Sequence, residues 1–310
     1  MAKIWLLVSA LLVVAMAASG CCCCCVPCRG SAWGDWDDWS QWPARAPVSV
    51  GELRQEQKSV PVDPTAVSAR VQILFGGGRL KLRPGATGLL DGQFTYNVNE
   101  LAPELTTRTQ GDVQVATLRP QREIRWGGWD TRDVRNEWDI RLNRDLPLAL
   151  DLNLGAFQGE VELGGLRLRD LTLNVGACDG TIMFSTPNPE TLSELEVLAG
   201  AARLSLTGLG NARFREMTFR GGAGDFELSF DGALTGRSRA EVESGISRLV
   251  IRVPAQVGTR VDLEGGLSST RLAGFRQSGT VFTNGSYDQV GEQLVITVKM
   301  GIGELALESE

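Results

Sequence analysis

The 310-residue chain contains no histidine, and this absence excludes more chemistry than any other feature of its composition. Without an imidazole there is no Ser-His-Asp or Cys-His catalysis, no histidine-bound zinc or iron, and no histidine-based pH switch. The sequence also lacks a phosphate-binding loop, a nucleophile elbow and a dinucleotide fingerprint. We therefore expect neither an enzyme nor a protein with a bound cofactor or metal.

The chain has no excess of basic residues either. Its 31 lysines and arginines are outnumbered by 37 aspartates and glutamates, which gives a formal net charge of −6. Nucleic acid calls for a basic face, so we predict no nucleic acid partner. Tyrosine is also scarce, with two residues against 37 glycines, which is typical of a turn-rich β protein. The length allows either one long repeat array or two ordinary domains.

One short pattern occurs four times between Leu148 and Gly232. Each copy has an apolar strand that alternates with polar residues, then a Gly-Ala pair, then a second alternating strand. The pairs are spaced by 21, 24 and 22 residues and are Gly155-Ala156, Gly176-Ala177, Gly200-Ala201 and Gly222-Ala223. A fixed period of this length is typical of stacked repeats, each of which needs its neighbours to bury its apolar face.

The alternation has a period of two, which predicts half-buried strands and excludes amphipathic helices. We predict an all-β, single-chain β-solenoid of two-strand coils of about 21–24 residues, stacked about 4.8 Å apart. Glycine suits each corner because it tolerates positive φ and has no side chain. The repeats are assigned to residues 145–310.

Residues 65–144 are less regular, and we predict an N-terminal β cap there, because a solenoid must not expose bare strand edges. Val71, Ile73 and Phe75 alternate before Gly76-Gly77-Gly78, which is the pattern of the later repeats. The sequence therefore leaves open whether the array begins there. The strand Asn136–Leu142 is predicted to lead into the repeats.

The N-terminal residues 1–20 read as a signal peptide or a membrane anchor. Lys3 precedes an apolar run from Ile4 to Ala18, and a small-residue segment precedes Cys21. Ala18-Ser19-Gly20-Cys21 resembles a bacterial lipobox, which implies that Cys21 is lipidated. An uncleaved helical anchor and free secretion remain as alternatives. All three place the bulk of the chain outside the cytoplasm, and the first two attach it to the membrane.

Residues 21–64 are predicted to form a disordered linker, because they are rich in cysteine, tryptophan and proline without a periodic apolar face. The segment holds six of the seven cysteines, at Cys21 to Cys25 and Cys28, and also Trp33, Trp36, Trp39 and Trp42. Cys25 and Cys28 have C-x-x-C spacing, but no second pair or βαβ pattern supports a zinc or redox site. The seventh cysteine, Cys178, is interpreted as a packing residue.

Three segments carry a resemblance to a known family: Asn136–Leu142, Leu150–Leu163, and Leu209–Phe214 with the Gly221–Gly224 corner after it. Together with the repeats and the N-terminal signal, they resemble the bacterial toast-rack family, which is related to C-terminal domains of cell-wall-active antibiotic response proteins and to adhesins with similar repeats. The resemblance implies a β-solenoid on the cell surface or in the envelope. It brings no catalytic residues.

Seven acidic residues in the repeats could form a sugar-cleaving pair or a calcium ladder. They are Asp151, Glu160, Glu162, Asp170, Asp179, Glu194 and Glu196. Because they alternate with apolar residues, we predict that they lie on the outer face of the strands. Arg167, Arg169, Arg203 and Arg213 occur in neighbouring repeats, so the prediction is a solvated surface of mixed charge.

These observations favour a non-enzymatic, envelope-anchored β-solenoid that acts as a surface scaffold or adhesin-like binding protein. The membrane would hold it through the N-terminal lipid or helix, and a cell-wall component or envelope protein would be its partner. Two alternatives remain. The family resemblance suggests an envelope stress or signalling module, and the use of β-solenoids by lyases and hydrolases suggests a polysaccharide-degrading enzyme.

Overall fold

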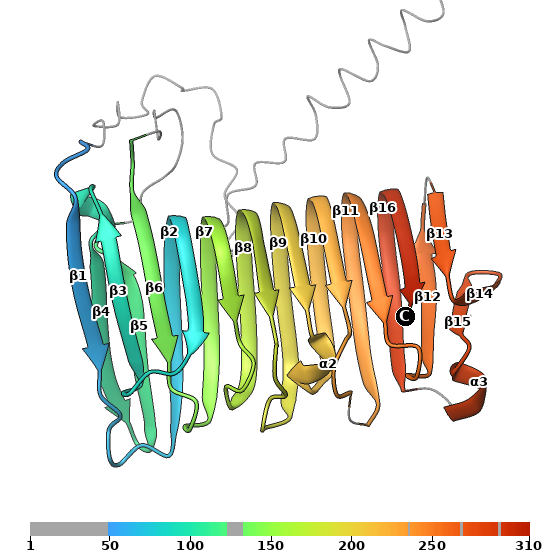
Figure 1. Ribbon diagram of the computed structural model, residues 1–310, viewed down its shortest axis with the longest axis horizontal. Helices are drawn as coiled ribbons and strands as arrows, with labels where there is room; N and C mark the ends of the chain where they lie inside the picture. Colours follow the sequence, from blue (N-terminus) through green and yellow to red (C-terminus); the bar gives the residue numbers. More distant parts are fainter. Residues whose placement is uncertain (1–48, 123–132, 235, 267–268, 291–292) are drawn as a thin grey trace, which may run out of the picture. The chain divides into compact units, whose positions relative to one another are not determined.

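Long bent strands of 15 to 17 residues stack side by side to form the centre of the structure (Figure 1). The computed structural model describes residues 49–122, 133–234, 236–266, 269–290 and 293–310. In spatial order the long strands are β2 (Ser68–Pro84), β7 (Leu148–Glu162), β8 (Leu168–Met183), β9 (Leu192–Thr207), β10 (Phe214–Ser229), β11 (Ser238–Val253) and β16 (Leu294–Ser309). Neighbours pair in parallel, and each long strand is one rung of the stack.

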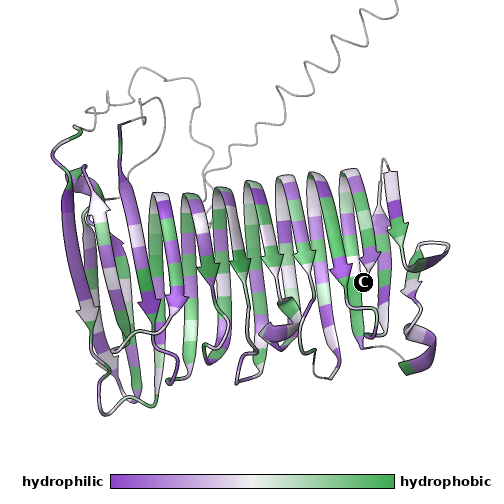
Figure 2. Cartoon of the chain, in the orientation of Figure 1, coloured by the Kyte–Doolittle hydropathy of each residue, from purple (hydrophilic) through white to green (hydrophobic). Residues whose placement is uncertain are grey.

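The rungs are in register, so equivalent residues form columns. Leu150 pairs with Leu171, Leu171 with Leu195, and Leu195 with Met217, which reproduces the predicted repeat period. Apolar and polar residues alternate along every rung (Figure 2), and the inward residues belong to one continuous core. Each fully buried leucine or valine contributes about 1.5–3 kcal/mol of hydrophobic stabilisation. The predicted all-β solenoid is confirmed.

Each rung bends at its glycine corner, so that a first limb and a second limb lie on opposite sides of the core (Figure 1). The prediction of two separate strands per coil differs from the structure on this point. Pairing continues on both sides of the corner, for example from Leu154 with Val175 to Ala156 with Ala177. The two predicted strands are therefore the two limbs of a single bent strand.

One glycine from each rung stands at the corner, and together these residues form the glycine column: Gly76, Gly155, Gly176, Gly200, Gly222, Gly245 and Gly301. A Cβ atom on Gly155 would lie 2.2 Å from the carbonyl oxygen of Gly76, and one on Gly176 would lie 2.5 Å from that of Gly155. The same clash recurs up the column. The φ angles of these residues lie outside the left-handed region, so close backbone approach, and not positive φ, requires glycine here.

The N-terminal end of the stack divides between the two limbs. Strand β5 (Val113–Pro120) pairs with the first limb of β2, and β6 (Asn136–Leu142) pairs with its second limb. Outside them lie β4 (Pro103–Gln110), antiparallel to β5, and β3 (Leu90–Tyr96), antiparallel to β6. A 3₁₀ turn, η2 (Asn99–Leu101), connects β3 to β4.

Strand β2 is a full rung, so the array begins at Ser68 and the predicted boundary at residue 145 is wrong. Strands β3 to β6 lie between β2 and β7 in the sequence, although β2 and β7 are neighbours in space. A search for adjacent repeats in the sequence therefore misses the first rung. The strand predicted at Asn136–Leu142 is confirmed. Its Trp138 is buried, and its ring packs edge-on against Phe75 and Phe94 at centroid distances of 5.1 and 5.3 Å.

The predicted linker 21–64 is wrong at its C-terminal end. Arg54–Val60 form strand β1, which pairs antiparallel with β3 along its whole length. This strand lacks the apolar alternation of a core strand because two of its inward positions hold Glu56 and Lys58. The predicted signal, the four tryptophans of the linker and Cys21 to Cys28 lie outside the described residues.

The C-terminal end contains a change in spatial order. Strands β12 (Thr259–Gly265) and β13 (Ser269–Ala273) pair with the first and second limbs of β16. Strands β15 (Val281–Asn284) and β14 (Phe275–Ser278) extend outward from β12, and α3 (Tyr287–Val290) precedes β16. The last strand in sequence is thus inserted between β11 and β12. The spatial order of the rungs therefore departs from their order in the sequence.

Short helix α2 (Leu209–Ala212) connects β9 to β10. Among the described residues, every helix falls short of the length and apolarity that a membrane crossing requires.

Gly176→Ala tests the glycine column. The new Cβ would lie 2.5 Å from the carbonyl oxygen of Gly155, so adjacent rungs must separate. We expect the free energy of unfolding to fall by about 2–3 kcal/mol, as for other overpacked sites. Denaturant melts followed by circular dichroism measure this. The control is Gly285→Ala, where no atom lies within 4 Å of the added Cβ. Equal stability of both variants would contradict the role of the column.

Candidate functional site

The most regular exposed feature is the corner ridge, which consists of the glycine column and the small or apolar residue that follows each glycine from β7 onward. These residues are Ala156, Ala177, Ala201, Ala223, Ile246 and Ile302, and all are exposed. They stand in register from rung to rung. The alanines leave the backbone close to the surface here, and columns of polar and charged residues lie on both sides.

The second-limb ladder is the column that follows the corner. Its members are Arg79, Gln158, Asp179, Arg203, Asp225, Arg248 and Glu304, in register. From Asp179 onward the charge changes sign at every rung. The Arg203 guanidinium lies 3.4 Å from Asp179 and 4.0 Å from Asp225, and Arg248 lies 4.0 Å from Glu304. Ion pairs this exposed contribute about 0–1 kcal/mol each, so the ladder remains available to a partner.

The first-limb ladder precedes the corner. Asn174 donates to Asn153 at 2.9 Å in its early rungs, Leu198 follows in β9, and Arg220, Glu243 and Lys299 occupy β10, β11 and β16. Arg220 pairs with Glu243 at 3.2 Å and with Glu196 at 3.7 Å. Lys299 pairs with Glu243 at 3.4 Å and also with Glu241. The hydrogen bond from Lys299 lowers the pKa of Glu241, which therefore stays charged.

The acidic residues predicted from sequence lie on the outer side of the rungs. Asp179 and Glu196 take part in ion pairs with the ladders, and Asp151 accepts a hydrogen bond from Gln72 at 3.3 Å. Glu162 accepts from the backbone of Gly164 and Ser185. Glu160 is exposed. The predicted mixed-charge surface is confirmed for these residues.

Asp170, Glu194 and Glu216 make a different arrangement, the acidic column. They are exposed and in register in three successive rungs, so like charges stack directly on one another. Within the described part of the chain, none of the three has an ion-pair partner, and no cluster of three or more metal-ligating residues is present. Sequence reasoning missed Glu216, which has the same alternating context as Glu194.

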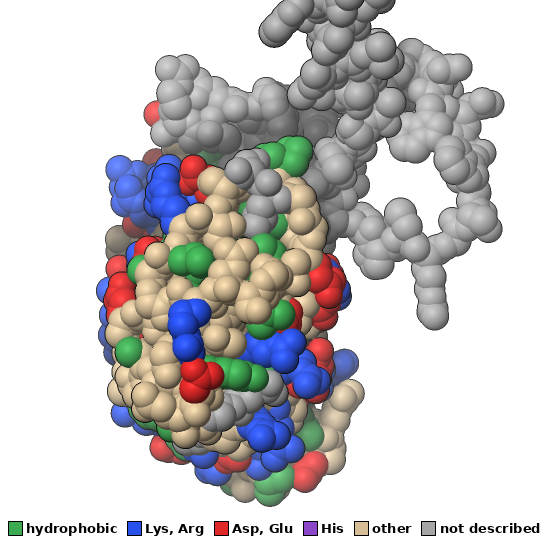
Figure 3. Space-filling model, turned by 90° about the vertical axis from the view of Figure 1, so that its right-hand side faces the viewer, with side chains coloured by type: hydrophobic (Ala, Val, Ile, Leu, Met, Phe, Trp, Pro, Cys, Tyr) green, Lys and Arg blue, Asp and Glu red, His purple; other side chains and the backbone are tan. Residues whose placement is uncertain are grey.

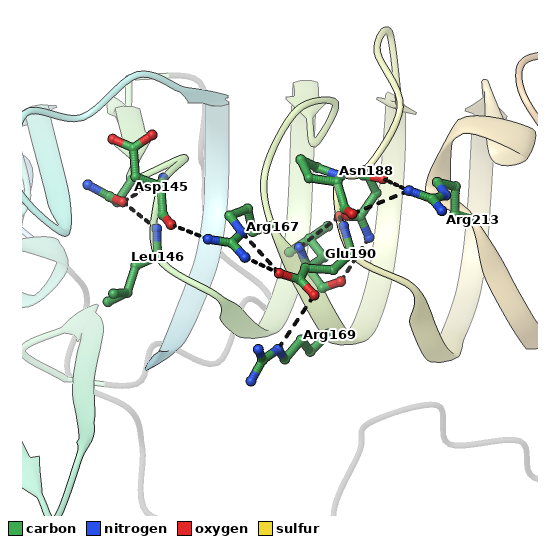
Figure 4. Close-up of polar contacts among 10 residues, drawn as sticks. Asp145, Leu146, Arg167, Arg169, Asn188, Glu190 and Arg213 are labelled. Carbon is green, nitrogen blue, oxygen red and sulfur yellow. Dashed lines mark hydrogen bonds and ion pairs between the residues drawn. The ribbon is translucent and has the colours of Figure 1, made fainter. Parts of the chain in front are cut away.

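Three of the four arginines expected beside the acids lie elsewhere, in a loop clamp at the far ends of the rungs (Figure 4). Arg167 donates to the Glu190 carboxylate and, at 3.0 Å, to the backbone oxygen of Asp145. Arg169 lies 3.9 Å from the same carboxylate. Arg213 donates to the backbone oxygens of Asn188 and Pro189 at 3.1 and 3.3 Å. These arginines join loops of successive rungs.

Asn188 is the buried centre of the loop clamp, with 1% of its surface exposed. Its amide nitrogen donates to the backbone oxygens of Leu168 (2.8 Å) and Ala212 (3.3 Å). Its side-chain oxygen accepts from the backbone nitrogens of Leu168 and Glu190, both at 3.1 Å. One side chain thus satisfies four backbone groups from three segments.

Cys178 packs against the core on the inner side of the corner, as predicted. Burial raises the pKa of its thiol to about 11, so it is protonated at neutral pH.

The fold and the ridge define a non-globular class of protein, a β-solenoid with repetitive charged columns on its outer face. Residues 49–193 match the family model described as the N-terminal domain of toast_rack, which spans β1 to the start of β9. The resemblance to the toast-rack family is thus confirmed for this part of the chain. None of the curated proteins matches the chain.

Solved structures are similar to this chain at low identity. A "putative cell adhesion protein" from Clostridium sporogenes is 18% identical, with 84% of this chain and 100% of that chain covered and a TM-score of 0.46. A "putative adhesin" from Bacteroides fragilis is 10% identical, with 83% and 97% covered and a TM-score of 0.34. A "putative lipid binding protein" from Parabacteroides distasonis is 14% identical, with 82% and 97% covered and a TM-score of 0.36.

Charge reversals in two columns test the registers. Glu194→Arg would place a cation between Asp170 and Glu216 and copy the alternation of the second-limb ladder. We expect a gain of about 0.5 kcal/mol in the free energy of unfolding at low salt. Arg203→Glu would create three stacked acids and should lose a similar amount. Both effects should shrink in 1 M NaCl, because salt screens exposed charges. Effects of the same sign in the two variants would contradict the columns.

Asn188→Ala tests the loop clamp. The change leaves buried backbone groups of Leu168, Glu190 and Ala212 without their partner, so we expect a loss of about 3 kcal/mol in the free energy of unfolding. Urea unfolding curves measure it. Asn174→Ala is the matched control, because the Asn174 hydrogen bond lies at the exposed surface. A loss of less than about 1 kcal/mol at Asn188 would show that the clamp is not needed.

Proposed function

We propose that the chain is a non-enzymatic, envelope-anchored β-solenoid that binds a component of the cell wall or envelope in an adhesin-like way. The single observation that carries this proposal is the corner ridge with its two flanking ladders. Glycine corners repeat at the spacing of parallel strands, about 4.8 Å. The second-limb ladder is charged from Asp179 onward, and the first-limb ladder is charged from Arg220 onward. A long surface of this kind suits a partner that is itself extended.

The charges of the ladders favour a mode of binding in which groups of the partner replace one side of a weak ion pair. Arg203 and Arg220 are each shared between two carboxylates in neighbouring rungs, and their side chains are 71% and 52% exposed. Such pairs cost little to open, so a partner that offers its own carboxylate or hydroxyl groups can take over these contacts. The ridge thus supports selective attachment without a deep pocket.

The position of the protein in the cell is the second part of the proposal. The apolar run from Ile4 to Ala18 and the lipobox-like Cys21 support membrane attachment on the outer side through an N-terminal lipid or helix. The anchor would hold the solenoid in the envelope, next to the wall. Labelling of the lipid on Cys21, abolished in Cys21→Ser, tests lipidation separately from binding.

Binding is tested with the full chain in mild detergent, incubated with purified cell-wall sacculi and, in a second arm, with solubilised envelope proteins. We expect co-sedimentation with wall material or capture of an envelope protein. The double variant Arg203→Gln with Arg220→Gln should weaken the interaction about tenfold, which corresponds to about 1.4 kcal/mol.

The matched control is Lys81→Gln, an exposed lysine on the second limb away from the ridge, which should bind as the unchanged chain does. Normal binding by the double variant would show that the ridge is not the binding surface. Failure of the unchanged chain to bind wall material or any envelope protein would contradict the adhesin-like role itself.

A further inference from the structure

The two ends of the stack differ in how their outermost strands are protected against pairing with another strand. A free strand edge presents unpaired N–H and C=O groups that can pair with any extended chain. Proteins block such edges with charged side chains that point inward or with a covering loop. The N-terminal end uses both devices.

On the second limb, edge strand β1 carries the inward charges. Glu56 pairs with Phe94 and Lys58 with Gly92, and both of these β3 residues are buried. Glu56 and Lys58 form an ion pair at 3.3 Å, and Glu56 also accepts a hydrogen bond from Tyr96. An added strand would have to bury this pair, which is costly.

On the first limb, a loop crosses the inner side of β4 and β5. The backbone nitrogen of Asp63 donates to Gln114 at 2.9 Å, and the Asp63 carboxylate accepts from Thr109 at 2.5 Å. The backbone nitrogen of Val67 donates to the backbone oxygen of Asp112 at 2.8 Å. The loop therefore covers the inner side of these two strands next to the turn that joins them.

Among the residues that the structure describes, neither device protects the second limb at the C-terminal end. Of the described strands, only β16 pairs with β13, so the other edge of β13 is open. All five residues of β13 are exposed. Its inward residues are Thr270 and Leu272, which pair with the buried Leu305 and Leu307 of β16. Neither carries a charge, and 38% of Leu272 is exposed, so the core is uncovered here.

The one charged residue of β13 is Arg271, which points outward between Thr270 and Leu272. Its side chain is 70% exposed and lies 3.7 Å from Glu304, a weak contact. Figure 3 shows the C-terminal face, on which uncharged side chains and backbone predominate and both basic and acidic side chains are set among them. An occupant of the edge is therefore favoured if it carries a carboxylate opposite Arg271 and apolar side chains on either side.

A second copy of the chain does not meet these requirements. Antiparallel pairing of β13 with itself, centred on Arg271, would set two arginines opposite each other, which is destabilising. Pairing with β1 of another copy would bury Glu56 and Lys58 against Leu272.

We propose that β13 is an acceptor edge for an added β-strand from a partner protein, whose segment has apolar residues at alternate positions and an acidic residue between two of them. Main-chain hydrogen bonds to β13 supply affinity, and contacts with Leu272 and Arg271 supply specificity, as in other cases of strand addition. The site is separate from the corner ridge and does not depend on its function.

The test uses the full chain in mild detergent and an acetylated, fluorescent peptide of sequence Thr-Val-Glu-Val-Thr-Val. We expect saturable binding by anisotropy and slower hydrogen exchange at residues 269–273, because strand addition pairs their free backbone groups. Leu272→Lys, which copies the inward charge of β1, should weaken binding at least about tenfold. Arg271→Gln should weaken it less and reduce its dependence on salt.

Two controls keep the outcome clear. Ile302→Lys changes a more exposed apolar residue, which lies on the ridge and off the edge, and should leave peptide binding unchanged. A peptide with the same composition but its three valines in sequence should not bind. The proposal is overturned if the alternating peptide fails to bind, if both peptides bind equally, or if Leu272→Lys and Arg271→Gln both bind normally. Concentration-dependent self-association that Leu272→Lys removes would assign the edge to a second copy, and would also overturn it.

Discussion

The close backbone approach along the glycine column is the constraint on which the rest of the structure depends. Each corner glycine lies against the carbonyl oxygen of the one before it, at a distance that leaves no room for a Cβ atom. The rungs can therefore bend at the same point and stay paired on both sides of the bend. If one corner moved by a residue, the inward leucines of that rung would turn outward, because a one-residue slip exchanges the faces of a strand.

The register also determines the chemistry of the surface. Because equivalent residues stack directly, a difference between successive repeats becomes a pattern along a column. The second-limb ladder alternates in sign from Asp179 to Glu304, whereas the acidic column keeps one sign from Asp170 to Glu216. These columns share one backbone and differ only in side chains. The outer face can therefore vary without any change to the core, which is how a repetitive scaffold acquires a particular binding surface.

Sequence reasoning succeeded where the information is local. A period of two and the Gly-Ala spacing predicted the rungs, their inward leucines and the packing role of Cys178, because each depends on residues close together in the chain. Strand β1 was missed, since an edge strand with inward Glu56 and Lys58 has the composition of a linker. The insertion of β16 beside β11 was also missed, because which rung becomes the neighbour of β11 depends on contacts between residues far apart in the sequence. The ion-pair ladders could be predicted only from the register of the rungs, which alternation alone does not provide. The contacts of the loop arginines depend on loop conformations, which alternation does not provide either.

The path of the C-terminal chain explains why one limb ends before the other. Strand β12, which ends at Gly265, and strand β13, which begins at Ser269, together make the last rung. On the first limb the chain adds β15 and β14 outside β12, which buries Phe282 and extends the sheet. On the second limb the sheet stops at β13, so the core that two limbs share is covered on one side and open on the other.

A stack of parallel rungs has no intrinsic end, because every rung offers the next one the same edge. Its length must be set by features added to the sequence, and here these are the inward charges at Glu56 and Lys58 and the loop at Asp63. The lack of any counterpart on β13 leaves one half of the last rung able to accept another strand.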